Sequence, residues 1–251
     1  MPSPTDSATH IGALDASLPQ VATCTVAQLD DFIRHVKSVL KTDFANVTGA
    51  VTPTHTELNY VAGVTSALQT QLNAGLSGRP VLITDTTISG SPSSVDFTTG
   101  IDGTYDEYWA ALSKVLPGTD GASLYVRTST NAGVSFDAGA SDYHFAGNYT
   151  VSSSGNNAFI SAAATQIQVA STGGGSAAGR GTTGVIRFWR PSAAEPFQMQ
   201  WLLSWLSTTG NLIVSSGAGM RNTSADVDAI RFLFSSGTMA SGRIKLFGRK
   251  V

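Results

Sequence analysis

Two stretches near the start of the chain repeat apolar residues at alternating steps of three and four. In "TVAQLDDFIRHVKSVLK" the repeated positions are Val26, Leu29, Ile33, Val36 and Leu40. In "THTELNYVAGVTSALQTQLNAG", residues 54–75, they are Leu58, Val61, Leu68 and Leu72, with the polar Thr65 in the same series. This is the spacing of the a and d positions of a heptad repeat. Each stretch is therefore predicted to be a helix with one narrow apolar seam.

Both predicted helices begin with a capping box, in which Thr25 precedes Gln28 by three residues and Thr54 precedes Glu57. Each spans about two heptads, roughly 22 Å, so neither is expected to be stable without a neighbour. In one interpretation the helices pack on their own domain. In the other the seam joins copies of the chain, and Thr65 helps to fix the register. The spacing alone leaves both open.

From Val81 onward the period of the apolar residues changes to two. In "FQMQWLLSW" one strand face would carry Phe197, Met199, Trp201, Leu203 and Trp205, and the other Gln198, Gln200 and Ser204. Similar alternation occurs in "GASLYVRTS", "AIRFLF" and "GRIKLFGRK", and turn signals such as "LPGTDGA" separate these segments. About ten short strands with such turns are typical of a β-sandwich, here predicted to be jelly-roll-like.

The predicted fold class is mainly β, with a short N-terminal coiled-coil-like stalk and a β-sandwich head. Residues 1–24 are expected to form an extended arm, residues 25–79 the helical stalk and residues 80–251 the head. The basic residues Arg243, Lys245, Arg249 and Lys250 indicate either an edge strand protected by charge or a contact with an anionic glycan.

Composition narrows the classes of partner. The 251 residues carry a formal net charge of −2, and only 13% are charged, which argues against a nucleic-acid partner. The apolar runs are far shorter than a membrane span, and the N-terminus lacks the pattern of a secretory signal. We therefore expect that the chain does not insert into a membrane and that it is synthesised in a cytosol. Cys24 is the single cysteine, so no disulfide within the chain and no cysteine-based zinc site is expected.

Four stretches of the sequence resemble segments of a known class of proteins. "VTPTHTELNYVAGVTSALQTQLNA" and the preceding "DDFIRHVKSVLKTDFANVTGAV" resemble the stalks of tail-fibre and other appendage proteins of tailed bacteriophages. "KVLPGTDGASLYVRTSTNAGVSFDAGASDYHF" and "IRFLFSSGTMASGRIKLFGRK" resemble β-sandwich modules at the ends of such proteins. These stretches cover about half of the chain. The resemblance implies a homotrimer in a virion tail, assembled in the host cytoplasm, with the arm bound to other tail or baseplate proteins.

Catalytic and metal-binding patterns are weak. "STNAGVSF", residues 129–136, resembles a degenerate Asp-box, which indicates a hairpin turn held by short polar side chains. No spacing selects a glycosidase pair among Asp102, Asp106, Glu107, Asp120, Asp137, Asp142 and Glu195. Asp142 and His144 could share a metal, but a third ligand is not evident. We expect no enzymatic activity, no metal and no cofactor.

Glycan binding is the function that the aromatic residues suggest, since sugars are held by an aromatic face with polar groups beside it. Core packing is the competing interpretation at every position. The candidates are Tyr105, Tyr108, Trp109, Tyr143, His144, Tyr149 and Trp189.

The expected protein is therefore a trimeric tail fibre or receptor-binding protein that attaches to a host-surface glycan without catalysis. One alternative is a head fibre, a decoration protein or an internal tail-tip protein that binds only virion partners. Another, of a different class, is a polysaccharide depolymerase.

Overall fold

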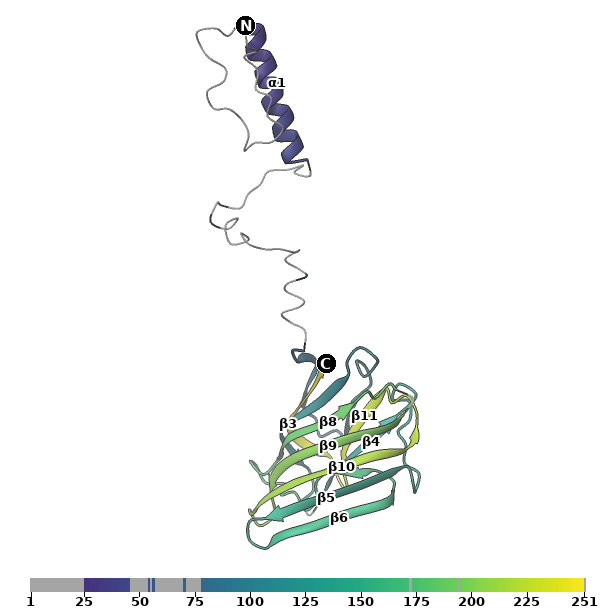
Figure 1. Cartoon of the computed structure of the whole chain (residues 1–251). Coiled ribbons are helices and arrows are strands. Elements are labelled where there is room, and N and C mark those ends of the chain that lie inside the picture. The colour runs from purple at the N-terminus through teal and green to yellow at the C-terminus, as the bar shows by residue number, and fades with distance from the viewer. Residues whose placement is uncertain are drawn as a thin grey trace. The chain divides into compact units, whose positions relative to one another are not determined.

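The computed structural model describes residues 25–45, 78–171, 173–193 and 195–250, and three single residues, Thr54, Thr56 and Thr70. The chain divides into two units, Met1–Leu68 and Gln69–Val251, and each is considered by itself (Figure 1). The predicted arm lies outside the described residues. So do nearly all of the second predicted helix and its seam positions Leu58, Val61, Leu68 and Leu72. No helix in the described ranges is long and apolar enough to cross a membrane.

The first unit contains the helix α1, Val26–Asp43, which confirms the first predicted helix. It begins directly after Thr25, whose carbonyl oxygen accepts a hydrogen bond from the Leu29 N–H at 3.0 Å. Asp30 and Arg34 form an ion pair of 2.7 Å at the i, i+4 spacing that stabilises helices. Of the seam residues, Val36 is half-buried, and four are exposed: Val26, Leu29, Ile33 and Leu40.

The second unit is built from strands, so the mainly β prediction is confirmed (Figure 1). Twelve strands occur in the described part of the unit. They are β1 (Val81–Ile88), β2 (Ser94–Phe97), β3 (Glu107–Pro117), β4 (Leu124–Ser129), β5 (Tyr143–Val151), β6 (Gly155–Ala164), β7 (Ile167–Gln168), β8 (Thr182–Trp189), β9 (Pro196–Leu206), β10 (Leu212–Ser224), β11 (Ala229–Phe234) and β12 (Met239–Arg249).

These strands form two sheets in which all paired neighbours are antiparallel. The larger sheet has the order β1-β12-β3-β8-β9-β10-β5-β6, and the smaller sheet has the order β2-β11-β4-β7. Buried apolar residues of both sheets belong to one cluster, which is consistent with a β-sandwich. The predicted edge strand at the C-terminus is wrong, because β12 lies between β1 and β3.

The strand β9 shows how the alternation of the sequence becomes a core. Phe197, Met199, Trp201, Leu203 and Trp205 are buried, while Gln198, Gln200 and Leu202 are exposed on the other side. Burial of a large apolar side chain stabilises the fold by about 1.5–3 kcal/mol relative to exposure. The face assignments predicted for this segment are therefore confirmed, and they place the two glutamines on the outer face of the larger sheet.

Two glycines make room for Trp201 behind that outer face. Gly217 and Gly147 are cross-strand partners in β10 and β5. An added Cβ atom would lie 2.3 Å from Cζ2 of Trp201 at Gly217 and 2.8 Å from it at Gly147. The indole Nε1 donates a hydrogen bond to Ser215 Oγ at 3.0 Å, and this hydroxyl donates to the carbonyl oxygen of Val169. The inner side of β5, β9 and β10 is thus closely packed.

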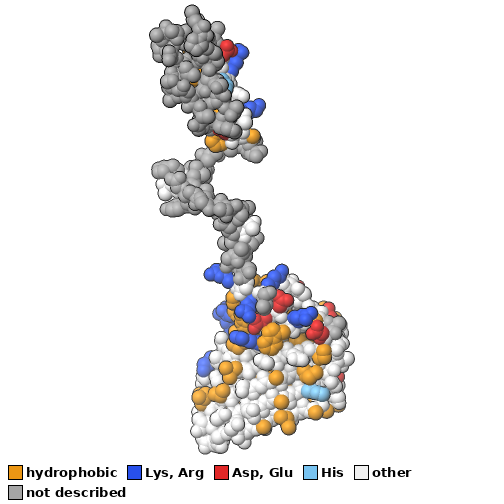
Figure 2. Space-filling view, viewed as in Figure 1, with side chains coloured by type: hydrophobic (Ala, Val, Ile, Leu, Met, Phe, Trp, Pro, Cys, Tyr) orange, Lys and Arg blue, Asp and Glu red, His pale blue; other side chains and the backbone are white. Residues whose placement is uncertain are grey.

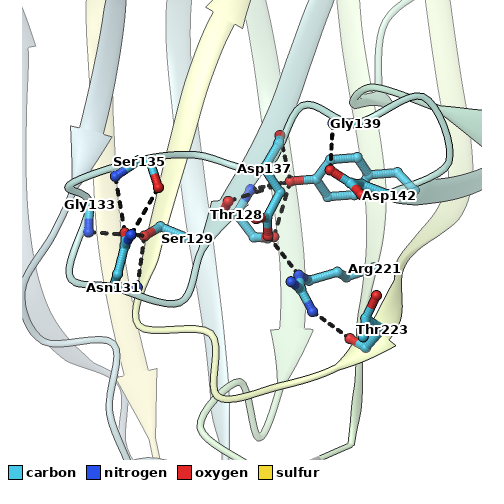
Figure 3. Close-up of polar contacts among 11 residues, drawn as sticks. Thr128, Ser129, Asn131, Gly133, Ser135, Asp137, Gly139, Asp142, Arg221 and Thr223 are labelled. Carbon is cyan, nitrogen blue, oxygen red and sulfur yellow. Dashed lines mark hydrogen bonds and ion pairs between the residues drawn. The ribbon is translucent and has the colours of Figure 1, made fainter.

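The turn after β4 is held by side chains as predicted (Figure 3). Oδ1 of Asn131 accepts from the Ser135 N–H at 3.0 Å, and Ser129 Oγ accepts from the Gly133 N–H at 3.0 Å. The prediction of a hairpin is nevertheless wrong, because β4 pairs with β11 and β7 whereas β5 pairs with β10 and β6. The segment connects the two sheets instead. Its Asp137 N–H donates to the carbonyl oxygen of Thr128.

Candidate functional site

The outer face of the larger sheet carries two neighbouring rows of side chains that cross several strands. In the first row, cross-strand pairing places Trp189 of β8, Gln198 of β9, Met220 of β10 and His144 of β5 side by side. The second row begins with Arg187 and continues through Gln200, Ala218, Ala146 and Ile160. These residues are distant in sequence, and only the strand order brings them together.

A depression with a volume of about 540 Å³ lies over these rows. We call it the outer groove, and its principal lining residues are Trp189, Gln198, Gln200, Met220, His144 and Ile160. It reaches from β8 to β6, which at the usual spacing of neighbouring strands is about 19 Å. The outer groove is therefore long enough for a short oligosaccharide rather than a single small molecule.

The outer groove exposes large apolar side chains. Ile160 is 76% exposed and Trp189 is 38% exposed. Gln198 and Gln200 are exposed between these apolar side chains. An exposed apolar patch rimmed by polar groups is typical of a binding surface. The combination of indole, carboxamides and imidazole offers both a flat apolar contact and hydrogen-bonding groups.

The lining of the outer groove is mostly uncharged, although Glu107 and Arg187 are cross-strand partners of its residues Trp189 and Gln200. Among its lining residues, His144 alone has an ionisable side chain. At the other end of the same sheet, Asp85 pairs with Arg243 and Lys245. Figure 2 shows Lys, Arg, Asp and Glu gathered toward one end of the visible face of the head, with mostly uncharged side chains over the rest.

A second ion-pair group lies beside the outer groove, around Glu107. Glu107 of β3 is 4% exposed, and it accepts a hydrogen bond from the Arg249 guanidinium. The guanidinium of Arg187 lies 3.9 Å from the same carboxylate. Arg187 does not line the outer groove, although it is the cross-strand partner of Gln200 and lines the neighbouring depression with it.

The structure brings Trp189 and His144, two of the predicted glycan-binding residues, together in the outer groove. Two other predictions are wrong, because Tyr108 and Tyr143 are fully buried in the core. The Tyr108 hydroxyl donates to the carbonyl oxygen of Asp102 at 2.6 Å. The Tyr143 hydroxyl accepts from the Thr128 N–H at 2.8 Å. Desolvation by burial raises the pKa of both tyrosines above their ordinary value.

The three remaining candidates lie outside the outer groove. Tyr105 packs edge-on against Tyr108, with ring centroids 5.7 Å apart. Trp109 stacks on Phe247 of β12 at 5.6 Å, near the charged end of the sheet. Tyr149 is partly buried against the core. Each is occupied by a neighbouring aromatic or by core packing, which was the competing interpretation for these positions.

Apart from Trp189 and His144, the lining residues were not among the sequence candidates; they include Gln198, Gln200, Met220 and Ile160. The alternation in β9 placed Gln198 and Gln200 on the non-core face, so the sequence did carry a signal for their exposure. Their proximity to Trp189 follows from the pairing of the consecutive strands β8 and β9, whose register the alternation alone does not specify.

Most carboxylates considered for catalysis form hydrogen bonds or ion pairs with neighbouring residues. Two of these carboxylates, Asp137 and Asp142, are drawn in Figure 3. Asp137 pairs with Arg221 at 2.7 Å, and Asp142 accepts from the Gly139 N–H. Hydrogen bonds from Thr104 lower the pKa of Asp102. Asp120 accepts from Ser176, and Glu195 pairs with Arg190. Within the described ranges, no group of three or more His, Cys, Asp or Glu could hold a metal ion.

Comparison of the chain with protein-family models, with curated proteins and with solved structures found no match.

Proposed function

We propose that this chain is a structural protein of a tailed-phage virion, a tail fibre or receptor-binding protein whose head attaches to a host-surface glycan without catalysis. The sequence resemblance of the stalk and head segments supports the virion role. The observation that carries the glycan role is Trp189, which is exposed in the outer groove beside Gln198 and Gln200 and in one row with His144.

The chemistry of these side chains suits a sugar. A sugar ring has a C–H face, which can stack on the indole of Trp189, and an edge of hydroxyl groups. The carboxamides of Gln198 and Gln200 can each donate and accept hydrogen bonds, as hydroxyl groups do. The apolar side chains of Met220 and Ile160, on β10 and β6, would exclude water around further units of a bound oligosaccharide.

A homotrimer would strengthen such a site. The a and d residues Leu29, Ile33 and Leu40 are exposed on α1, and an 18-residue helix is marginal without packing. Association of three seams would bury these side chains. Three linked heads would also make the second and third glycan contacts intramolecular, which raises the overall affinity of weak individual sites.

We infer that eight of the strands form a jelly roll. The pairs β1–β12, β2–β11, β3–β8 and β4–β7 are nested along the chain, as expected when one long antiparallel hairpin is wrapped into two four-stranded sheets. The remaining strands form two hairpins, β5–β6 and β9–β10, which extend the larger sheet. The outer groove lies over these hairpins and β8, so the ligand site would be an addition to the jelly roll.

The absence of catalysis in this proposal rests on the carboxylates. A glycosidase of the usual kind needs two carboxyl groups facing each other across the sugar. The lining of the outer groove contains no Asp or Glu. Glu107, on the larger sheet, pairs with Arg249. Asp137, in the segment that follows β4, pairs with Arg221.

The test is competition for host attachment. Saturating full-length protein should slow adsorption of the parent phage to its host, and Trp189→Ala protein should lose this effect. Leu202→Ala is the matched control, because Leu202 is exposed on the same face but does not line the outer groove. Normal adsorption in saturating wild-type protein would overturn the proposal. Competition that survives Trp189→Ala would place the receptor site elsewhere.

A second candidate is a head fibre or decoration protein that binds only other virion proteins. It is favoured by a neighbouring depression of about 620 Å³ whose lining includes Leu202 and Val214. Leu202 is 61% exposed, which suits a protein contact better than a sugar contact. In that case adsorption would be unaffected by the soluble protein, and antibody against the head would label the capsid of intact particles.

A further inference from the structure

We infer that the outer groove takes an uncharged glycan containing an N-acetylated amino sugar, an inference that rests on the glycan-binding function proposed above. Three features of the lining carry it. They are a recess floored by two alanines, a carboxamide beside that recess, and the lack of fixed charge among the lining side chains.

The recess lies where the two added hairpins meet. Ala218 of β10 and Ala146 of β5 are direct cross-strand partners on the outer face. Longer side chains flank them on three sides, since Gln200 and Ile160 continue the same row and Met220 lies in one adjacent row; Ser216 and Asn148 form the row on the fourth side. Two methyl side chains between longer neighbours leave space for one small apolar substituent, and their apolar floor disfavours a hydroxyl group that would lose its hydrogen bonds to water.

An acetamido group matches both the recess and its rim. Its methyl group would contact Ala218 and Ala146. Its carbonyl oxygen and N–H are one acceptor and one donor, and the carboxamide of Gln200 offers the complementary donor and acceptor. Gln200 is exposed, so its carboxamide is accessible to a ligand. A sugar with only a hydroxyl group at this position would neither contact the apolar floor nor form both hydrogen bonds with Gln200.

The charge distribution favours an uncharged ligand. A sugar acid or a phosphorylated glycan needs a fixed cation. The nearest arginine in the row, Arg187, does not line the outer groove, and its guanidinium lies 3.9 Å from the Glu107 carboxylate. A free amino sugar needs a carboxylate, and the lining contains none. Burying either charge without a partner would cost binding free energy.

Distance indicates that the ligand is an oligosaccharide. Trp189 and Ala218 are on strands two steps apart, which is about 10 Å across the sheet. One sugar ring therefore does not stack on Trp189 and place its acetamido group over the alanines at the same time. The two contacts belong to different sugar units of one chain.

The first experiment is calorimetric titration of the full-length protein with the tetrasaccharide of N-acetylglucosamine. The comparison ligands are the glucose and glucosamine tetrasaccharides of the same linkage. We expect the acetylated ligand to bind at least about tenfold more tightly than either comparison ligand. Equal affinity for the glucose tetrasaccharide, tighter binding of the glucosamine tetrasaccharide, or no binding of the acetylated ligand would overturn the inference.

Filling the recess provides a second readout. Ala218→Val should remove the preference for the acetylated ligand, while Ser216→Val, two residues earlier on the same face of β10 and outside the outer groove, should keep it. Both positions are exposed in a strand, where a β-branched residue is tolerated, and equal thermal unfolding temperatures would verify folding. An unchanged preference in Ala218→Val would contradict the placement of the acetamido group.

The outcomes separate this inference from the function on which it rests. Protein that blocks phage adsorption but does not prefer the acetylated ligand would leave the proposed function intact and overturn the inference. Protein that neither blocks adsorption nor binds any of the three ligands would count against both.

Discussion

At the residue scale, the position of each tryptophan within its strand decides its role. Trp201 shares the inner face of β9 with Met199 and Leu203, so it is core. Trp189 follows the buried Phe188 in β8, and the two-residue period therefore turns it outward. The sequence predicted the burial of Trp201 from its apolar neighbours at i±2. It left the role of Trp189 open, because the flanking Arg187 and Arg190 are compatible with several environments.

We predict opposite effects for the two tryptophans. Trp201→Ala should lower the free energy of unfolding by about 3–5 kcal/mol, because it leaves a cavity beside Gly147 and Gly217 and removes the indole hydrogen bond to Ser215. Trp189→Ala should change it by less than about 1 kcal/mol, as expected for a surface position. Urea unfolding of the full chain followed by circular dichroism measures both. Similar losses in the two variants would contradict the assignment of Trp189 to a ligand surface.

At the element scale, the two ends of the larger sheet differ in chemistry. β1 is an edge strand, and its Asp85 forms ion pairs with Arg243 and Lys245 of β12. The basic residues of β12 had indicated an edge strand. They are instead matched by carboxylates on β1 and β3, a result of strand order that the local sequence does not contain. The opposite end of the sheet is built from the added hairpins and carries the outer groove.

The ion pairs of Asp85 make one contribution to stability dependent on pH. Its hydrogen bond with Arg243 lowers the pKa of Asp85 below the ordinary value of 3.8. The folded state thus binds a proton less readily than the unfolded state. The stabilisation is fully present above the unfolded pKa and is lost as the pH falls through the folded pKa. Asp85→Asn should therefore show a smaller loss of stability than the wild type between about pH 5 and pH 2.

This prediction is measured as the midpoint of urea unfolding at several pH values. Asp226→Asn removes another exposed carboxylate of the head and serves as the charge-matched control. If the unfolding midpoint of Asp85→Asn changed with pH as much as that of the wild type, the pairs with Arg243 and Lys245 would not stabilise the folded head.

At the scale of the whole molecule, the proposed function includes association of three copies of the chain. The helix α1 exposes Leu29, Ile33 and Leu40 at a and d spacing, and the resemblance implies three wound helices. The head has a core of its own, formed by both sheets. Oligomerisation is therefore expected to depend on the stalk, whereas the head is expected to fold without it.

We expect light scattering to give a solution mass of three chains of 26.0 kDa for the full-length protein. A double variant with Leu29→Gln and Ile33→Gln should reduce this mass, because polar side chains at a and d positions remove the apolar contact. Lys37→Gln, on the same helix but outside the seam, should remain trimeric. A fragment beginning at Arg79 tests whether the head alone associates. A monomeric full-length chain would contradict the trimer and favour packing of the helices within one copy.

The amino-acid sequence by itself determined the local features of this protein. Capping and periodicity predicted the start of α1, and alternation predicted which residues of β9 face the core, because both depend on neighbours within a few residues. Strand order was decided only by the tertiary structure, which corrected the hairpin after β4 and the edge position of β12. It also buried Tyr108 and Tyr143 and aligned Trp189, Gln198, Met220 and His144. The physical reason is that cross-strand neighbours are selected by packing of the whole sheet, which no short stretch of sequence specifies.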